Sequence, residues 1–429
     1  MSELASFPLN GCDTFMLAMD YAMQRDGRSH NVCHLLLTFP HATDLNSLLD
    51  SIVEHETFAS VTRLRLATPL LRTPRWIASG SPIKRGEVMI HARCASAEEL
   101  QTFIISHHLN VRTESPFGVI ALPNLNDGPS LLFYWHHALC DAHGGEMLIQ
   151  RIATPTNANT PSLTPSPLPH VPRMKALRRA HHTKRFIYAQ ARPAIVRLAR
   201  TGTPSPDHRY RKVIFSQEQT TTIDDAVKRL TGGMFPTALF LAATARAASR
   251  TPATRINENA PLFVPVPHDM RRTTKQRSPL SNQVSVAFFK IQPHNTSLID
   301  LTNAVIEQLH DTIAEQHHHG MLDFLRCIRR LPARAFWKII EHPTAGHPAS
   351  LYFSDIGASL SSIQTIGGTP VVYATHYPPN LSPPGLTTVW SRYRGSLEVT
   401  VCYDRATLSD DHLDTFERNL RRDLLEAAA

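Results

Sequence analysis

Apolar residues in the first 150 positions form runs and spacings that predict both strands and helices. Residues 33–39 and 119–122 are short apolar runs, which are typical of strands, whereas apolar residues recur at helical spacing over 45–56. Residues 131–135 are apolar on both faces, as expected of a central strand that is buried on two sides.

The pattern continues in the second half of the chain. A strand is expected at 213–215, helices at 217–230 and 236–249, and a further strand at 262–266. These elements alternate along the chain, so strands and helices are mixed in both halves.

The last 45 residues give the sharpest local signals. Residues 386–393 and 396–403 flank Arg394-Gly395, and the second of them alternates apolar and polar positions, which predicts a hairpin. A final helix is expected to start at Ser409, with acidic residues in its first turn. Its buried face is expected to hold Leu413, Phe416, Leu420 and Leu424. The fold class is therefore α/β or α+β.

A proline-rich tract divides the chain. Residues 154–172, TPTNANTPSLTPSPLPHVP, contain six prolines and almost no core-forming residues, which is typical of a semi-extended linker. We therefore expect an N-terminal lobe at 1–153, a linker with a basic segment at 154–208, and a C-terminal lobe at 209–429. The length of 429 residues is sufficient for two such cores.

Composition excludes several classes of protein. With 42% hydrophobic and 19% charged residues, the chain is neither disordered nor fibrous. No apolar run is long enough to span a membrane, and the first 24 residues contain no Lys or Arg, so a secretory signal is not indicated and a cytoplasmic location is expected.

The cysteines and histidines do not predict a metal site or a disulfide framework. The six cysteines are far apart with no CxxC pair, so we expect reduced thiols. The dense histidine tract His317-His318-His319 lacks a partner at metal-ligand spacing, and we interpret it as a solvated helix face.

The net charge of +8 is concentrated in one segment. Between residues 173 and 200 there are nine basic residues and no acidic one, so the rest of the chain is close to neutral and a nucleic-acid-binding function is not favoured. The apolar residues Ile187, Ala191, Ile195 and Leu198 fall on one helical face, although Pro193 is expected to interrupt it. This segment is expected to contact an anionic membrane, coenzyme A phosphates or an acidic carrier protein, or else to be a solvated helix between the lobes.

Residues 131–150, LLFYWHHALCDAHGGEMLIQ, are the segment that carries candidate chemistry. A buried strand leads directly into His136-His137, and Asp141, Gly144 and Gly145 precede an apolar helix. Imidazole titrates near neutral pH, so a histidine at the mouth of a strand suits general base catalysis. Taken alone, this spacing is more often that of a pair of core histidines.

The run HHALCDAHGG resembles the HHxxxDGxxG signature of wax ester synthase/diacylglycerol acyltransferases and of nonribosomal peptide condensation domains, both in the chloramphenicol acetyltransferase-like superfamily. PLNGCDTFML resembles the PLSxxDxxFL opening of the first group. Further matches follow in the same order: MFPTALFLAATARA, PVPHDMRR, LSNQVSVAFF and YFSDIG. The similarity thus extends along nearly the whole chain.

The resemblance implies two chloramphenicol acetyltransferase-like lobes that form a V-shaped pseudo-dimer around a central active-site channel. It implies that His137 is the general base and that His136 and Asp141 belong to the catalytic motif. Asp141 could lie beside His137 at i, i+4, but the family implies that it pairs with an arginine, for which Arg271 or Arg272 is the candidate.

Other residues receive roles by the same resemblance. Asn282 and Ser354 are candidates for contacts with the oxyanion or the acceptor substrate. Gly145 is expected where the helix packs close to the sheet or to substrate, or is an ordinary glycine at the start of a helix. Cys140 is interpreted as a packing residue, not as a nucleophile.

The sequence also departs from the family pattern. Ala142 replaces the glycine after the aspartate, Pro236-Thr237 replaces an Asn-Asp pair, and Asp355 replaces an asparagine. The plant-type DFGWG motif is absent. These changes retain the base but weaken the case for wax or triacylglycerol synthesis in particular.

The resulting hypothesis is an acyltransferase that moves an acyl group from acyl-coenzyme A or an acyl carrier protein to a hydroxyl of a hydrophobic acceptor. No metal and no resident cofactor are expected. The alternatives are an amide-forming N-acyltransferase of the condensation type and a non-catalytic member that binds a carrier protein or an acyl ligand. Peripheral contact with a membrane through residues 173–200 is a further expectation.

Overall fold

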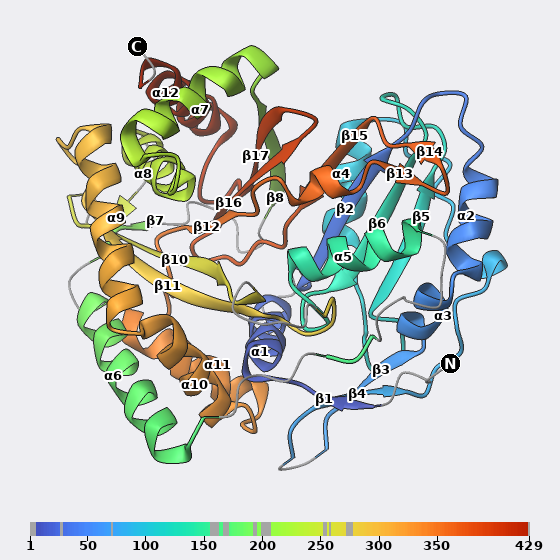
Figure 1. The fold of residues 1–429 in the computed structure, drawn as a ribbon, viewed down its shortest axis with the longest axis horizontal. Helices are drawn as coiled ribbons and strands as arrows, with labels where there is room; N and C mark the ends of the chain where they lie inside the picture. The colour runs from blue at the N-terminus through green and yellow to red at the C-terminus, as the bar shows by residue number, and fades with distance from the viewer. Residues whose placement is uncertain are drawn as a thin grey trace.

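Two four-stranded sheets, each with its own helices, lie side by side and organise the molecule (Figure 1). The computed structural model describes residues 6–25, 29–69, 72–154, 163–165, 171–191, 195–198, 207–251, 255–256, 259–271 and 278–427. The mixed α/β class predicted from the sequence is confirmed.

The first sheet has the order β15-β2-β6-β5 and is antiparallel throughout. Its strands are β2 (Val32–Thr38), β5 (Phe117–Leu122), β6 (Ser130–His136) and β15 (Tyr373–Tyr377). Strand β6 is interior, and Leu131, Phe133 and Trp135 are fully buried. The prediction of a central strand at 131–135 is therefore confirmed.

Helices cover both faces of this sheet. Helices α2 (Leu45–Glu54), α3 (Glu56–Thr62) and α5 (Ala142–Ala153) share a core with Phe133 and Trp135. Helix α4 (Ala97–Ser106) packs on the opposite face. The single helix expected over 45–56 is divided at His55, whose backbone is extended and whose Nδ1 accepts a hydrogen bond from Thr57 N at 3.1 Å, capping α3.

The second sheet has the order β12-β16-β17-β8. Its strands are β8 (His208–Ile214), β12 (Tyr352–Asp355), β16 (Leu386–Tyr393) and β17 (Ser396–Asp404). Strands β16 and β17 form the predicted hairpin, and both turn residues have positive φ, 48° at Arg394 and 81° at Gly395. Two positive φ angles are typical of the tight turns that join hairpin strands.

Three helices share a core with the second sheet: α7 (Gln217–Thr231), α8 (Pro236–Ser249) and α12 (Asp410–Glu426). All three follow the predicted positions closely. Ser409 caps α12 by accepting from His412 N, and the four predicted apolar residues of α12 are buried. The periodicity of these segments is strong enough to locate them without tertiary information.

A third group of elements lies beside both sheets (Figure 1). It consists of α1 (Gly11–Arg25), α6 (Arg173–Ala191), β10 (Leu262–Asp269), β11 (Val284–Ile291), α9 (Leu298–Ala314), α10 (His317–Ile328) and α11 (Ala333–Glu341). Strands β10 and β11 form a two-stranded antiparallel sheet. Helix α1 packs on α10 and α11, so the start of the chain is tied to its second half.

The remaining elements are short. In the part of the chain that the structure describes, they are β1 (Phe7–Pro8), β3 (Leu64–Ala67), β4 (Arg75–Ala78), β7 (Arg197–Leu198), β9 (Arg255–Ile256), β13 (Thr365–Ile366), β14 (Thr369–Pro370) and the 3₁₀ turns Arg85–Glu87, His342–Thr344 and Ser359–Ser362.

The expectation that Ile195 and Leu198 lie on the same helical face as Ile187 and Ala191 is wrong. Helix α6 ends at Ala191, and Arg197–Leu198 forms a strand that pairs with β9. The buried residues of α6 are small: they are Ala176, Ala180, Thr183 and Ala191, of which only Ala191 was predicted. Pro193 and most of the proline-rich tract lie outside the described residues.

One strand crosses between the two halves of the chain. Strand β15 belongs to the segment 209–429, yet it pairs with β2 in the first sheet. The division at 153 and 208 remains a proposal, and any such division has to allow for this crossover. In the part of the chain that the structure describes, no helix is both long enough and apolar enough to cross a membrane.

Candidate active site

His137 lies at the junction between the first sheet and α5. Strand β6 ends at His136, and the backbone N–H of His137 donates to Asn31 O at 2.8 Å. A short loop then leads to Asp141, which caps α5. The buried strand and the capped helix therefore fix both ends of the motif.

His136 points away from the cavity and is not brought into the expected catalytic set. It is fully buried, its Nδ1 accepts from Ala138 N at 3.1 Å, and its Nε2 lies 3.5 Å from Asp20 Oδ2. Because Nδ1 accepts, the proton is on Nε2 and faces the carboxylate on α1. His136 thus anchors the end of the strand to α1.

His137 instead lines a cavity of about 240 Å³. Its Nδ1 lies 3.1 Å from Asn282 Oδ1, and the Asn282 amide nitrogen donates to His137 O at 2.8 Å and to Asp13 Oδ1 at 2.9 Å. With its amide nitrogen so occupied, Asn282 presents its oxygen to His137. Nδ1 therefore carries the proton, and the lone pair of the neutral ring is on Nε2.

Burial lowers the pKa of His137 from its ordinary value, so the ring is neutral at pH 7. A neutral imidazole with its proton fixed on Nδ1 is the state that a general base requires. Asn282, which was expected to contact substrate, contacts the base in this arrangement.

Asp13 is a residue of the candidate site that the sequence analysis did not single out. It is fully buried on α1, and its Oδ1 accepts from Asn282 N at 2.6 Å as well as from the Asn282 side chain. Burial raises the pKa of Asp13 to about 6, although hydrogen bonds from Asn282, Asn10 and Ser281 act in the opposite direction. The signal was its place in PLNGCDTFML, where the family pattern also has an aspartate.

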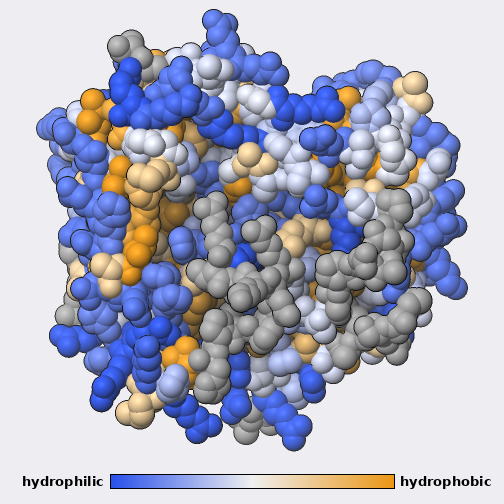
Figure 2. Space-filling model, viewed as in Figure 1, coloured by the Kyte–Doolittle hydropathy of each residue, from blue (hydrophilic) through white to orange (hydrophobic). Residues whose placement is uncertain are grey.

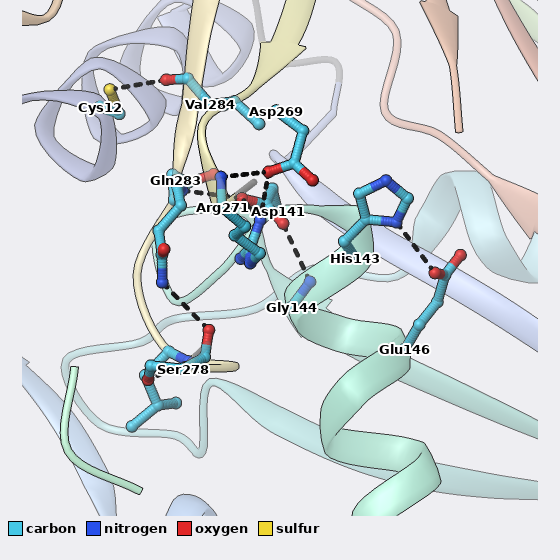
Figure 3. A network of polar contacts seen from close by, with 12 residues as sticks. Cys12, Asp141, His143, Gly144, Glu146, Asp269, Arg271, Ser278, Gln283 and Val284 are labelled. Atoms are coloured by element: carbon cyan, nitrogen blue, oxygen red, sulfur yellow. Dashed lines mark hydrogen bonds and ion pairs between the residues drawn. The ribbon is translucent and has the colours of Figure 1, made fainter. Parts of the chain in front are cut away.

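Asp141 does not form a dyad with His137. Its Oδ2 lies 2.9 Å from Arg271 Nη1 and accepts from Gln283 N at 2.9 Å, while Oδ1 accepts from Gly144 N at 2.9 Å (Figure 3). Burial would raise the pKa of Asp141, but the charge and hydrogen bond of Arg271 together with the two backbone donors lower it. The expected contact with Arg271 is present, and Arg272 lies outside the described residues.

The residues around Asp141 are packed tightly. A Cβ atom on Gly145 would lie 2.4 Å from the ring of Trp135, so this glycine lets α5 approach the sheet. Gly145 is not among the cavity-lining residues. Cys140 is fully buried, and burial raises the pKa of its thiol far above the ordinary value, which suits a packing residue.

The cavity wall is mainly apolar. It is formed mainly by α1, α6, α10, α11, β10, β11, β12 and β16 together with the end of β15. Representative lining residues are Met16, Met19, Ile187, Phe324, Trp337 and Ile340. Such a wall fits a hydrocarbon chain or another apolar group.

Two expected positions also line this cavity. Ser354 lies on β12, and Ala142, which replaces the glycine of the family pattern, lies at the start of α5. The structure thus brings His137, Ala142 and Ser354 to one cavity wall, whereas Asp141 and Arg271 lie behind it.

The other departures from the family pattern contact each other. Thr237 Oγ1 donates to Asp355 Oδ2 at 2.6 Å, and Asp355 Oδ1 accepts from Gly357 N at 3.0 Å. Both residues stand where the pattern has different side chains. Their contact shows that the two replacements fit one local environment.

The histidine tract at 317–319 is not simply solvated. His317 is buried, stacks on Phe186 with ring centroids 4.0 Å apart, and lies 3.3 Å from Thr183 Oγ1. It therefore joins α10 to α6, which corrects the interpretation of this tract as an exposed face. In the described parts of the chain, no three His, Cys, Asp or Glu side chains come together to hold a metal ion.

Many solved structures match this chain, and the following three share its fold over nearly their full length. Trichothecene 15-O-acetyltransferase from Fusarium sporotrichioides matches with a TM-score of 0.69 and 12% identity, covering 98% of this chain and 95% of that chain. The first condensation domain of the CDA synthetase matches with a TM-score of 0.68 and 15% identity, covering 100% and 98%. The wax ester synthase/diacylglycerol acyltransferase from Marinobacter aquaeolei VT8 matches with a TM-score of 0.60 and 16% identity, covering 99% and 100%.

No protein-family model and no curated protein sequence matches the chain. At 12–16% identity the structural matches establish the fold alone, which is the chloramphenicol acetyltransferase-like fold. The expectation of this fold is therefore confirmed.

Proposed function

We propose that the protein transfers an acyl group from a thioester to a hydroxyl group of a hydrophobic acceptor, with His137 as the general base. The observation that carries the proposal is the fixed imidazole in the apolar cavity. Asp13 orients Asn282, Asn282 accepts from Nδ1 of His137, and Nε2 is left with its lone pair. The fold, shared with O-acyltransferases, supports the same reaction class.

In the proposed reaction, Nε2 of His137 takes the proton of the acceptor hydroxyl as its oxygen attacks the thioester carbonyl carbon. The resulting tetrahedral oxyanion collapses, the carbon–sulfur bond breaks, and the imidazolium returns the proton to the leaving thiolate. The products are an ester and a free thiol. The two substrates and this chain's own side chains suffice for these steps.

Asp141 and Arg271 act as positioning residues in this scheme. Their buried ion pair joins the start of α5 to the segment that follows β10, and Asp141 also holds the backbone of Gln283, next to Asn282. The pair thereby fixes the loop that carries His137 relative to Asn282. Ser354, on the cavity wall, is a candidate for contact with the oxyanion or the acceptor.

An amine acceptor is the nearest alternative, because the same base can serve amide formation. We favour a hydroxyl acceptor since two of the similar structures are named as an O-acetyltransferase and a wax ester synthase. A non-catalytic binding protein is the second alternative. The retained lone pair on His137 Nε2 argues for catalysis.

The test is the release of free thiol from short- to long-chain acyl-coenzyme A, with and without long-chain alcohols, diacylglycerol and amines. Products are identified by mass spectrometry, so ester and amide are separated directly. Acceptor-dependent release supports the proposal. If no donor and acceptor pair reacts, the same panel is repeated with acyl groups on an acyl carrier protein. No acceptor-dependent thiol release in either panel contradicts the proposal.

The surface beside the cavity supports contact with an anionic membrane. Helix α6 contains no acidic residue and exposes Met174 and Leu177 among its basic residues. Its neighbour α10 ends at a second basic run without acidic residues, which includes Arg326, Arg329 and Arg330. Strongly hydrophilic residues gather at the lower left of the face in Figure 2, where α6 and α10 lie in Figure 1. Basic residues around exposed apolar side chains are typical of helices at membrane surfaces.

This contact would bring the cavity close to a source of hydrophobic acceptor, since Lys184, Ile187 and Tyr188 of α6 line it. Vesicle flotation tests the proposal. Binding to vesicles that contain phosphatidylglycerol, absent with pure phosphatidylcholine, supports it. Equal binding to both, or to neither, contradicts it.

A further inference from the structure

A second carboxylate with two imidazoles lies outside the histidine motif. Glu146 is on α5, one turn beyond Asp141, and is 2% exposed. Its Oε1 lies 2.8 Å from His376 Nε2, and its Oε2 lies 3.2 Å from His143 Nδ1. The contact with His143 is seen in Figure 3, beside the network of Asp141.

The protons in this cluster can be assigned. Burial would raise the pKa of Glu146, but side-chain hydrogen bonds from His143 and His376 lower it to about 2. The carboxylate is therefore ionised and can only accept hydrogen bonds. Both imidazole nitrogens that contact it therefore carry a proton, and in the His376 tautomer that donates through Nε2 the lone pair is on Nδ1.

His376 is also fixed in place. It lies on β15, the strand that crosses into the first sheet, and it meets the ring of Trp135 edge-on with centroids 6.1 Å apart. Its ring lines the same cavity as His137. Among the described residues, no hydrogen-bond partner is found for its Nδ1.

We propose that His376 is a substrate-binding residue that accepts a hydrogen bond, through Nδ1, from an O–H or N–H group of the molecule that fills the cavity. This group is distinct from the hydroxyl that His137 deprotonates. The proposal rests on the proposed function only in taking the cavity as the substrate site. It makes Glu146 a positioning residue that fixes the tautomer of His376.

Two substrates can supply such a donor group. One is the acceptor, if it bears a second hydroxyl, and the other is the thioester donor, whose pantetheine arm has amide N–H groups. In an apolar cavity an acceptor nitrogen that stays without a partner weakens binding, so the cavity should favour ligands with a donor at this position.

The test measures binding, not turnover, by titration calorimetry with the full chain. The probes are α,ω-diols of six to twelve carbons, the matching primary alcohols, and coenzyme A. For His376→Phe we expect about three- to tenfold weaker binding of the diols or of coenzyme A, which is the worth of one hydrogen bond, with the primary alcohols unchanged. If the variant binds the diols more weakly, the O–H group that His376 contacts belongs to the acceptor substrate. If it binds coenzyme A more weakly, the contacted group belongs to the thioester substrate.

Two further variants separate this contact from a packing effect. Glu146→Gln keeps the side-chain volume, but its amide can donate to His376 Nε2 and so place the proton on Nδ1, and we expect it to weaken the same probe. His34→Phe is the matched control, because His34 is a buried histidine on the neighbouring strand β2 that does not line this cavity. It should leave the binding of all probes unchanged.

The proposal is overturned if His376→Phe affects no probe, or if it weakens alcohols and diols equally. Should Glu146→Gln fail to fold, the ¹⁵N resonances of histidine-labelled wild-type protein give the same answer: the Nδ1 signal of His376 should shift with the favoured probe. Because no acyl transfer is needed, a negative result here is distinct from a failure of the proposed function.

Discussion

The side-chain amide of Asn282 donates to Asp13 Oδ1 at 2.9 Å, and this contact decides which end of Asn282 faces the base. The amide nitrogen is held by Asp13 and by His137 O, so the amide oxygen is turned to His137 Nδ1. An interaction between α1 and the segment just before β11 thus sets the tautomer of the histidine that follows β6.

Asn282→Leu should therefore lower kcat by about 10- to 100-fold. This is part of the rate acceleration of about 10²- to 10⁴-fold that a general base contributes. The KM of both substrates should change little, because Asn282 orients the base and does not hold substrate. Steady-state kinetics with the best donor and acceptor pair check this. If the substitution changes KM alone, Asn282 contacts substrate, as the sequence analysis expected, and does not orient the base.

The pH dependence of kcat/KM should follow the neutral form of His137. Since burial lowers its pKa, activity should be level near pH 7 and fall on acidification with a midpoint below 6.5. Asp13, with its pKa raised to about 6, titrates in the same window. Profiles of the wild type and of Asp13→Asn separate the two groups, and a midpoint above pH 7 in both would be inconsistent with this base.

The buried ion pair of Asp141 and Arg271 should matter for stability. Arg271→Met leaves an uncompensated buried carboxylate, so we expect the free energy of unfolding to fall by about 3–5 kcal/mol. The double variant with Asp141→Asn should recover part of this loss, because the stranded charge is removed. Urea denaturation of both variants provides the comparison, and equal losses would show that the charge is not the cause.

Gly145→Ala tests the close approach of α5 to the sheet. The added Cβ would meet the ring of Trp135, whose neighbours leave little room for it to move, and we expect a loss of about 1–3 kcal/mol in the free energy of unfolding. Ala142→Gly, three residues earlier on the cavity wall, is the control for changes at the helix start. Thermal melts that show no loss for Gly145→Ala would mean that α5 can shift without cost.

Much of the fold could be predicted from the sequence where the signal is local. The hairpin around Arg394-Gly395, α8 and α12 are each specified by their own turn residues, caps or periodicity. Strand β15 was missed because its identity depends on pairing with β2, more than 300 residues earlier. The break at His55 was missed because it depends on a side-chain cap within an otherwise helical spacing.

In the candidate site, too, features with a local sequence signal could be predicted, and features that depend on distant contacts could not. The strand, the histidines and the helix after them are consecutive, so the local pattern located the pair His136-His137, and the family resemblance chose His137. Whether His136 or His137 faces the cavity depends on α1, which supplies Asp20, and the role of Asn282 depends on Asp13. These contacts join residues that are more than 100 positions apart, and no local pattern contains them.

The comparison of wild type with His137→Ala on the best donor and acceptor pair tests the central claim most directly. We predict that acceptor-dependent thiol release falls by about 10²- to 10⁴-fold while the fold, judged by thermal melting, is retained. Thiol release that continues at the wild-type rate in a folded His137→Ala protein would contradict the assignment of His137 as the base.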